Sequence, residues 1–199
     1  EVALHHRTAG NQSQALEWTL LAARRNARLC NHEEALREYQ AALELSDRSD
    51  RRLRLEIEEA AAQIAEAAGQ PEQALAHLGN ARRLAGEAGD EAAALRSIGA
   101  TGRIHNVRGE VPRALKVLKE GLTQAEASGA SGSPPHPREY ASLCRLMAQT
   151  LLNAGQPENA ESYCAKGLAV LGDEATAGLT WTMGHVLAVK GRRAEALRC

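Results

Sequence analysis

The stretch GQPEQAL at residues 69–75 decides the fold, because its pattern recurs along the chain. Each copy has a small residue, four variable positions and then an alanine that opens an apolar periodic run. Clear copies start at Gly109, Gly155 and Gly191, and weaker ones at Gly10 and Cys30. Repetition at intervals of about 20 to 50 residues is typical of repeat proteins, whose units bury their apolar faces against their neighbours. The sequence therefore predicts a repeat protein whose function lies on a surface.

Each copy also has the chemistry of a helix hairpin. Gly69 is suited to end one helix, because glycine adopts the left-handed conformation that other residues resist. Pro71 suits the first turn of the next helix, where its missing N–H costs nothing. Ala74 lets the two helices approach closely, since a larger side chain would separate them. The pattern predicts a helix, a sharp turn and an antiparallel second helix.

The key alanines set the size of the repeat. They are Ala15, Ala35, Ala74, Ala114, Ala160 and Ala196, at intervals of 20, 39, 40, 46 and 36 residues. The longest interval contains SGASGSPPHP at 128–137, and such a Gly, Ser and Pro cluster is typical of a flexible loop between helices. On apolar periodicity we expect about eleven helices, at 1–9, 12–29, 33–45, 51–68, 71–87, 91–108, 111–128, 137–154, 157–171, 174–190 and from 192 onward.

Composition agrees with an all-α fold and narrows the function. Aromatic residues make up 3% of the chain and Phe is absent, so the core must be packed with Ala and Leu. A net charge of -1 favours neither nucleic acid nor a membrane surface. No apolar stretch reaches the roughly 18 residues of a membrane span. We found no motif of an enzyme, so we expect no catalytic activity, no cofactor and no metal site.

Cysteine and histidine have structural interpretations. Cysteines stand at 30, 144, 164 and 199 without a C-x-x-C pair, which favours a reduced, cytoplasmic setting. Cys144 and Cys164 fall on partner helices of one predicted hairpin, where they act as small buried hydrophobes or, alternatively, as a redox switch. His105 and His185 lack companion ligands for a metal. His5 and His6 are adjacent, so they point in different directions on a helix.

The two ends of the sequence indicate a piece of a larger protein. The chain starts at Glu1 without Met and stops at Cys199, within the last predicted helix. Solenoids end in polar capping repeats, and neither end supplies one. We therefore expect residues 1–199 to be a single solenoid taken from a longer chain.

The pattern resembles the tetratricopeptide repeat (TPR). Small residues recur about twelve positions before the key alanine (Ala62, Gly102, Ala148, Gly184) and about seven after it (Ala81, Gly121, Gly167). The resemblance implies a right-handed superhelical solenoid of antiparallel helix hairpins. The long units and the opening of the chain, residues 5–45, are similar to the TPR-like region that follows the ATPase module of large bacterial signalling proteins. These are LuxR-type transcriptional regulators, adenylate cyclases and serine/threonine kinases.

The resemblance also implies a concave groove, lined by the first helix of each hairpin, in which a partner peptide or helix lies. Positions that match the family's groove are Arg24, Arg28, Glu56, Glu59, Gln63, Arg96, Arg103, Asn106, Arg145, Gln149, Asn153, Trp181 and His185. Those from Arg96 onward are our candidate partner-binding residues. The segment from Arg103 to Asn153 is basic and rich in amides, which suits an acidic or C-terminal segment. Alternatively, these are ordinary solvated side chains, and Trp181 is partly buried by packing.

Three functions fit these features. The first is a protein-interaction scaffold or regulatory module of a larger bacterial signalling or transcription regulator, which does not itself contact nucleic acid. The second is a small-molecule inducer sensor, with a deep pocket that includes Trp181. The third is self-assembly, as a homodimer through apolar surface at the ends.

Overall fold

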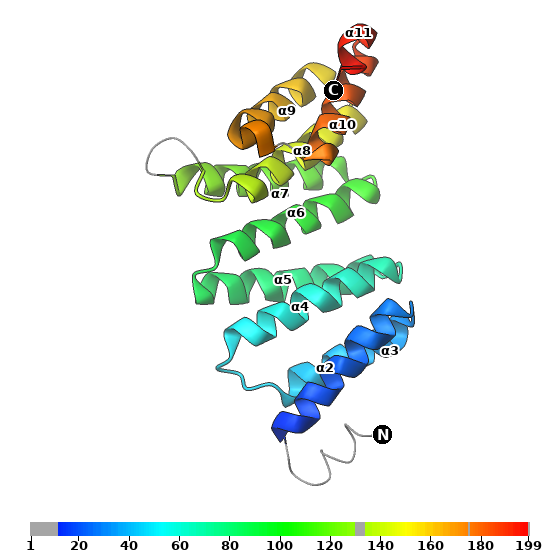
Figure 1. Cartoon of the computed structure of the whole chain (residues 1–199), viewed down its shortest axis with the longest axis vertical. Helices are drawn as coiled ribbons and strands as arrows, with labels where there is room; N and C mark the ends of the chain where they lie inside the picture. Colours follow the sequence, from blue (N-terminus) through cyan, green and yellow to red (C-terminus); the bar gives the residue numbers. More distant parts are fainter. Residues whose placement is uncertain (1–11, 130–133, 175, 199) are drawn as a thin grey trace. The chain divides into compact units, whose positions relative to one another are not determined.

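The computed structural model describes residues 12–129, 134–174 and 176–198, which fold into ten α-helices and one short 3-10 helix (Figure 1). Within these residues there is no strand, so the predicted all-α fold is confirmed. The helix expected at 1–9, which includes His5 and His6, lies outside the described residues.

The chain divides into two compact units, Glu1–Ser97 and Ile98–Cys199, and the division falls inside helix α6. The first unit contains α2 (Gln12–Arg28), α3 (His32–Leu45), α4 (Arg51–Ala67), α5 (Pro71–Ala88) and the first part of α6 (Glu91–Val107). In this unit α2 pairs with α3, α4 pairs with α5, and α3 packs on α4. That the whole chain acts as one solenoid stays a prediction.

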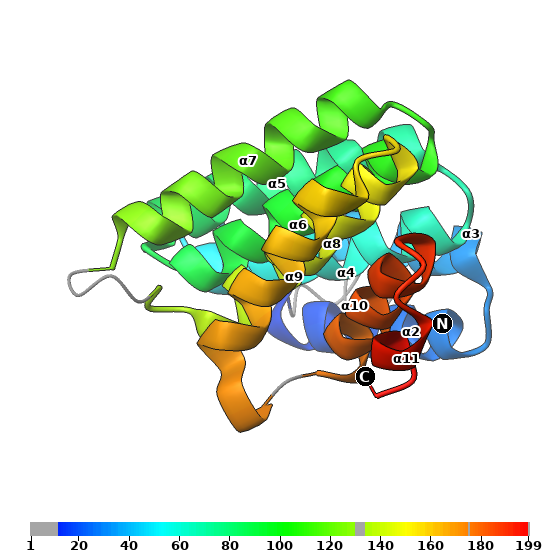
Figure 2. The same cartoon turned by 90° about the horizontal axis from the view of Figure 1, so that it is seen from above.

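The second unit repeats the same hairpin plan. After the rest of α6 it contains α7 (Val111–Ala127), α8 (Pro137–Asn153), α9 (Pro157–Leu171), the 3-10 helix η1 (Gly172–Glu174), α10 (Ala177–Val189) and α11 (Arg193–Ala196). Figure 2 shows α8 and α9 side by side, and α10 packs on α8, α9 and α11. The helix predicted at 174–190 begins later, at Ala177, because Gly172 is left-handed with a φ of 54° and η1 occupies the start of the predicted range.

Left-handed residues end the helices where the sequence predicted them. Gly69, Gly109, Gly155 and Gly191 have φ angles between 70° and 78°, and Cys30 takes the same place in its copy with a φ of 58°. After Gly69, the N–H of Gln70 donates to the Ala65 carbonyl at 2.8 Å, and the Gln70 carbonyl accepts from the N–H of Ala74 at 3.0 Å. One residue thus closes the first helix by a Schellman bond and opens the next helix.

The key alanines lie in the helix contacts. Ala15, Ala35, Ala74, Ala114 and Ala160 have no exposed surface. Ala196 is half-buried, because the short helix α11 packs against α10 as a single turn. The burial of the first five alanines fits the close-approach role that we predicted for them.

Glycines of the second unit bring its helices closest together. A Cβ on Gly102 would lie 2.5 Å from Cδ2 of Leu118, and a Cβ on Gly121 would lie 2.7 Å from Cγ2 of Ile98. Real Cβ atoms essentially never show such distances, so a larger residue at either position would require Leu118 or Ile98 to shift. In the first unit, Ala62 and Ala81 hold the equivalent positions and are buried.

Candidate functional site

Five predicted binding residues form one polar surface in the second unit. Arg103 and Asn106 come from α6, and Arg145, Gln149 and Asn153 come from α8, where a spacing of four places them on one helix face. Nδ2 of Asn153 donates to Oδ1 of Asn106 at 3.0 Å, which joins the two helices. The charge of Arg103 also acts on Arg145. We call these five residues the Arg–amide surface.

Arg145 is the unusual member of this surface. Burial, and next the neighbouring positive charge of Arg103, lower the pKa of its guanidinium. Its Nη1 donates to Oε1 of Gln149 at 3.1 Å, and among the described residues no carboxylate pairs with it. Buried charges are normally paired. The surface therefore offers a partly desolvated cation to an anionic group.

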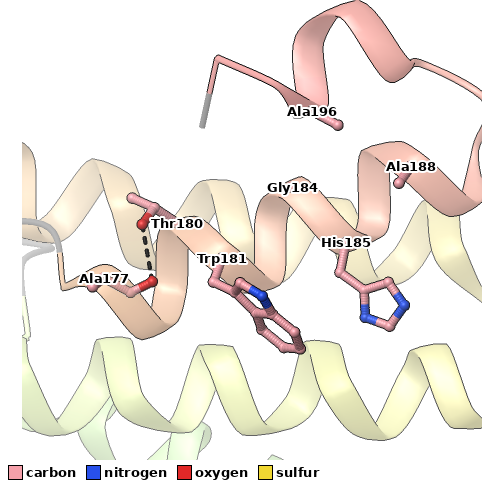
Figure 3. Close-up of a pocket in the computed structure, with 7 residues that line it drawn as sticks. All are labelled: Ala177, Thr180, Trp181, Gly184, His185, Ala188 and Ala196. Atoms are coloured by element: carbon pink, nitrogen blue, oxygen red, sulfur yellow. Dashed lines mark hydrogen bonds between the residues drawn. The ribbon is translucent and has the colours of Figure 1, made fainter.

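Helix α10 packs against α8 beside Arg145. Cδ of Arg145 lies 3.5 Å from the place that a Cβ on Gly178 would take. Trp181 is about one turn further along α10, and His185 about two turns further. Their ring centroids are 5.6 Å apart, and Figure 3 shows both rings on the same side of the helix. Trp181 is 64% exposed, so most of its ring is in solvent and only the smaller part is covered by packing.

These two rings border a pocket of about 450 Å³. Its other lining residues are Ala177, Thr180, Gly184, Ala188 and Ala196, which come from α10 and α11 (Figure 3). Because Trp181 keeps most of its surface in solvent, this is an open surface pocket and not the deep cavity expected of an inducer sensor.

The predicted positions of the first unit are charge-paired or exposed. Nη2 of Arg96 lies 3.2 Å from Oε1 of Glu59, so this ion pair joins α6 to α4. Burial raises the pKa of Glu59, and the nearby Arg96 partly opposes the rise. Nε of Arg52 lies 3.7 Å from Oε1 of Glu56. The remaining predicted positions, Arg24, Arg28 and Gln63, are exposed.

A second polar site, in the first unit, was not predicted from the sequence. Glu58 of α4 is 4% exposed. Its Oε2 lies 2.6 Å from Nδ1 of His77, and Nδ2 of Asn80 donates to its Oε1 at 3.1 Å. Both partners come from α5, so α4 and α5 share a buried carboxylate with each oxygen satisfied.

The missed burial of Glu58 has a simple cause. Ala60 and Ile64 of α4 are apolar, yet both are only half-buried. The buried side of the helix includes Ala61 and Ala65, which follow Glu58 by three and seven positions. That spacing was the available signal, because three and seven residues return to the same helix face.

The other reactive side chains have structural roles. Cys144 and Cys164 are buried and form no disulfide with any described residue, and burial raises the pKa of the Cys144 thiol to about 12, which fits the interpretation as small hydrophobes. Nδ1 of His105 lies 2.7 Å from Oε2 of Glu110. Among the residues with described placement, no group of three or more His, Cys, Asp or Glu side chains could hold a metal. None of the described helices is both long and apolar enough to cross a membrane.

Repeated hairpins with small residues at fixed places define a helical-repeat protein of the TPR-like class. Solved structures of this kind are similar to the chain. BtubC (BKLC) from P. vanneervenii has a TM-score of 0.73 at 16% identity, over 98% of this chain and 81% of its own. A putative kinesin light chain from P. anserina, with nearly identical TPR-like repeats, has a TM-score of 0.65 at 17% identity, over 92% and 90%.

The third similar structure is a Rap regulator. It is the Rap conjugation gene regulator of the plasmid pLS20 in complex with the Phr* peptide, with a TM-score of 0.72 at 14% identity, over 96% of this chain and 53% of that chain. These likenesses confirm the TPR-like fold. No protein-family model matches the sequence, and no curated protein matches it significantly.

Proposed function

We propose that the chain is a protein-interaction module whose second unit binds an acidic peptide or helix along the Arg–amide surface. The observation that carries this proposal is Arg145, a half-buried cation whose partner within the described part of the chain is an amide and not a carboxylate. A carboxylate that reaches Arg145 gains a charge-assisted hydrogen bond, which is shorter and stronger than a neutral one. It also relieves the repulsion between Arg145 and Arg103.

The amides around Arg145 complete the recognition. Asn106, Gln149 and Asn153 each have both donor and acceptor atoms, so they can bond the backbone of an extended segment. Trp181 lies on α10, three residues after Gly178, which is next to Arg145. Its exposed ring can contact an apolar side chain of the same ligand. The ligand class is therefore a segment with a carboxylate followed by an apolar residue.

The comparison with the Rap regulator supports a peptide ligand. That TPR-like protein was solved in complex with a peptide. We extend this mode of binding to the present chain, as part of a larger bacterial signalling or transcription regulator in the cytoplasm. The absence of enzymatic activity, and the sensor and self-assembly alternatives, stay predictions from the sequence.

An array of matched peptides tests the proposal. Each acidic peptide is paired with a copy in which every Asp and Glu is replaced by Asn and Gln. We expect the unsubstituted chain to bind acidic peptides of the array, and the Arg145→Gln variant to lose this binding. Arg138 is an exposed arginine of the same helix, and Arg138→Gln should leave binding unchanged. Equal retention of both members of each pair, or equal binding by the two variants, would contradict it.

A further inference from the structure

Beside the buried Glu58 there is a polar pocket of about 440 Å³ in the first unit. Its lining comes from α3, the α3–α4 connection, α4 and α5. The charged and amide side chains among the lining residues are Gln40, Glu44, Arg48, Arg54, Glu58, His77 and Asn80. Small-molecule sites have volumes of about 300 to 1,000 Å³ and a few fixed polar groups. This pocket meets both conditions and does not include the Arg–amide surface.

Arg54 is held in place from one side only. Its Nη1 donates to the carbonyl of Leu43 at 2.7 Å and to Oγ of Ser46 at 2.8 Å. Ser46 in turn donates to Leu43 at 2.9 Å, at the C-terminal end of α3. Nε and Nη2 of Arg54 have no partner among the described residues. A guanidinium that is fixed by one nitrogen presents the rest of its fork to a carboxylate.

The two acidic side chains of the pocket, Glu58 and Glu44, differ in whether they have partners. Glu58 is already satisfied, because His77 and Asn80 take one oxygen each. Glu44 follows Leu43 directly, so it lies near the anchored end of Arg54, yet it has no hydrogen bond or ion pair with a described residue. Arg48 has none either. The pocket thus combines cations and an anion whose charges are not used within the described structure.

From this arrangement we infer that the pocket binds a small zwitterion of the α-amino-acid class. The ligand carboxylate pairs with Arg54, assisted by Arg48, and the ligand ammonium pairs with Glu44. Glu58, with His77 and Asn80, forms the rigid polar wall. A purely anionic ligand would meet the charges of Glu44 and Glu58, and a purely cationic one would meet both arginines, so charge complementarity favours a molecule that carries both signs.

The test uses the chain as it is, titrated with each of the common amino acids at millimolar concentration. Calorimetry measures affinity, and NMR of the Asn80 and Gln40 side-chain amides locates the ligand. For the best binder we add two matched analogues, its amide, which lacks the carboxylate, and its deaminated acid, which lacks the ammonium. We expect saturable binding that shifts both amide signals, and at least about tenfold weaker binding by either analogue.

Two variants and a control keep the test decisive. Arg54→Gln should weaken binding about tenfold or more, because a charge-assisted bond is lost. Glu44→Gln changes an exposed side chain and therefore leaves the fold intact. It should weaken binding of the amino acid and leave binding of its deaminated acid unchanged. Arg82→Gln, an exposed arginine of α5 outside the pocket, should change nothing. Absence of binding by every amino acid, equal binding of the deaminated acid, or insensitivity to both variants would overturn the inference.

Discussion

The polar face around Arg96 in the first unit and the polar face around Arg145 in the second unit differ in their charge pairing. In the first unit Arg96 of α6 meets the carboxylate of Glu59 on α4. In the second unit Arg145 donates a hydrogen bond to the amide oxygen of Gln149 on the same helix, α8. The positive charge of Arg103 on α6 helps to lower the pKa of Arg145. One repeat pattern places both polar faces, yet Arg96 pairs with a carboxylate while Arg145 pairs with none among the described residues. The repeat therefore determines where a polar face lies, while single residues decide what it binds.

The units also differ in how closely their helices pack. Where the first unit has Ala62 and Ala81, the second has Gly102 and Gly121. The glycines accept Leu118 and Ile98 at distances that exclude a Cβ. At these two positions the second unit has glycine, which lowers helix propensity but lets the helices approach closely.

The largest effect should come from reversing the cation of the second unit. Arg145→Glu is expected to lower the affinity for an acidic peptide about a hundredfold, because it replaces a charge-assisted hydrogen bond by repulsion between two negative charges. Arg96→Glu should alter the same affinity by less than about twofold, since Glu59 already occupies that arginine. Fluorescence anisotropy measures both. Equal losses in the two variants would remove the distinction between the units.

Packing gives the next effect. Gly121→Ala should lower the free energy of unfolding by about 1–3 kcal/mol, because the new methyl group overlaps Ile98. Gly79→Ala in α5 meets no atom within 4 Å and should instead raise it by about 0.5–1 kcal/mol. Urea unfolding followed by circular dichroism compares them. A stabilising Gly121→Ala would show that the second unit is not closely packed at this glycine.

A smaller effect is expected at the left-handed turns of the first unit. Cys30 holds a φ of 58° that favours glycine, so Cys30→Gly should raise the free energy of unfolding by about 0.5–1 kcal/mol. Gly69→Ala, at a φ of 70° and with no atom within 4 Å of its new Cβ, should lower it by about 1 kcal/mol. Thermal unfolding measures both. A change of the same sign in both variants would rule out backbone strain as the cause.

The smallest effect concerns pH, and its sign differs between two carboxylates. Burial raises the pKa of Glu59, so the folded first unit binds the proton more tightly and loses stability as pH rises through that folded pKa. Hydrogen bonds from Lys190 and Arg192 lower the pKa of Glu161 in the second unit, so its contribution is present above the unfolded pKa and is lost as pH falls through the folded one.

Unfolding of Glu59→Gln and Glu161→Gln, measured against the unsubstituted chain between about pH 3 and 7, checks both signs. With rising pH, the stability of the unsubstituted chain should fall relative to Glu59→Gln and rise relative to Glu161→Gln. Two differences that move in the same direction would contradict the assignment.

Local signals in the sequence were enough for the fold. Gly69 and its counterparts predicted the turns, and Ala74 predicted the helix contact, because backbone conformation and side-chain size act at short range. The late start of α10 was missed, since nothing in the sequence separated η1 from a helix. The burial of Glu58 was missed because its stabilisation comes from His77 and Asn80 on another helix. The lowered pKa of Arg145 likewise depends on burial and on Arg103 of another helix, which the local sequence does not reveal.

The most direct test observes Arg145 itself. In an ¹⁵N NMR titration of the arginine Nε–H signals, an acidic peptide selected on the array is compared with its Asn/Gln copy. We predict that the acidic peptide shifts the signal of Arg145 and leaves that of Arg96 in place, and that the neutral copy shifts neither. Equal shifts by both peptides, or a shift at Arg96 without one at Arg145, would contradict recognition of acidic segments by the second unit.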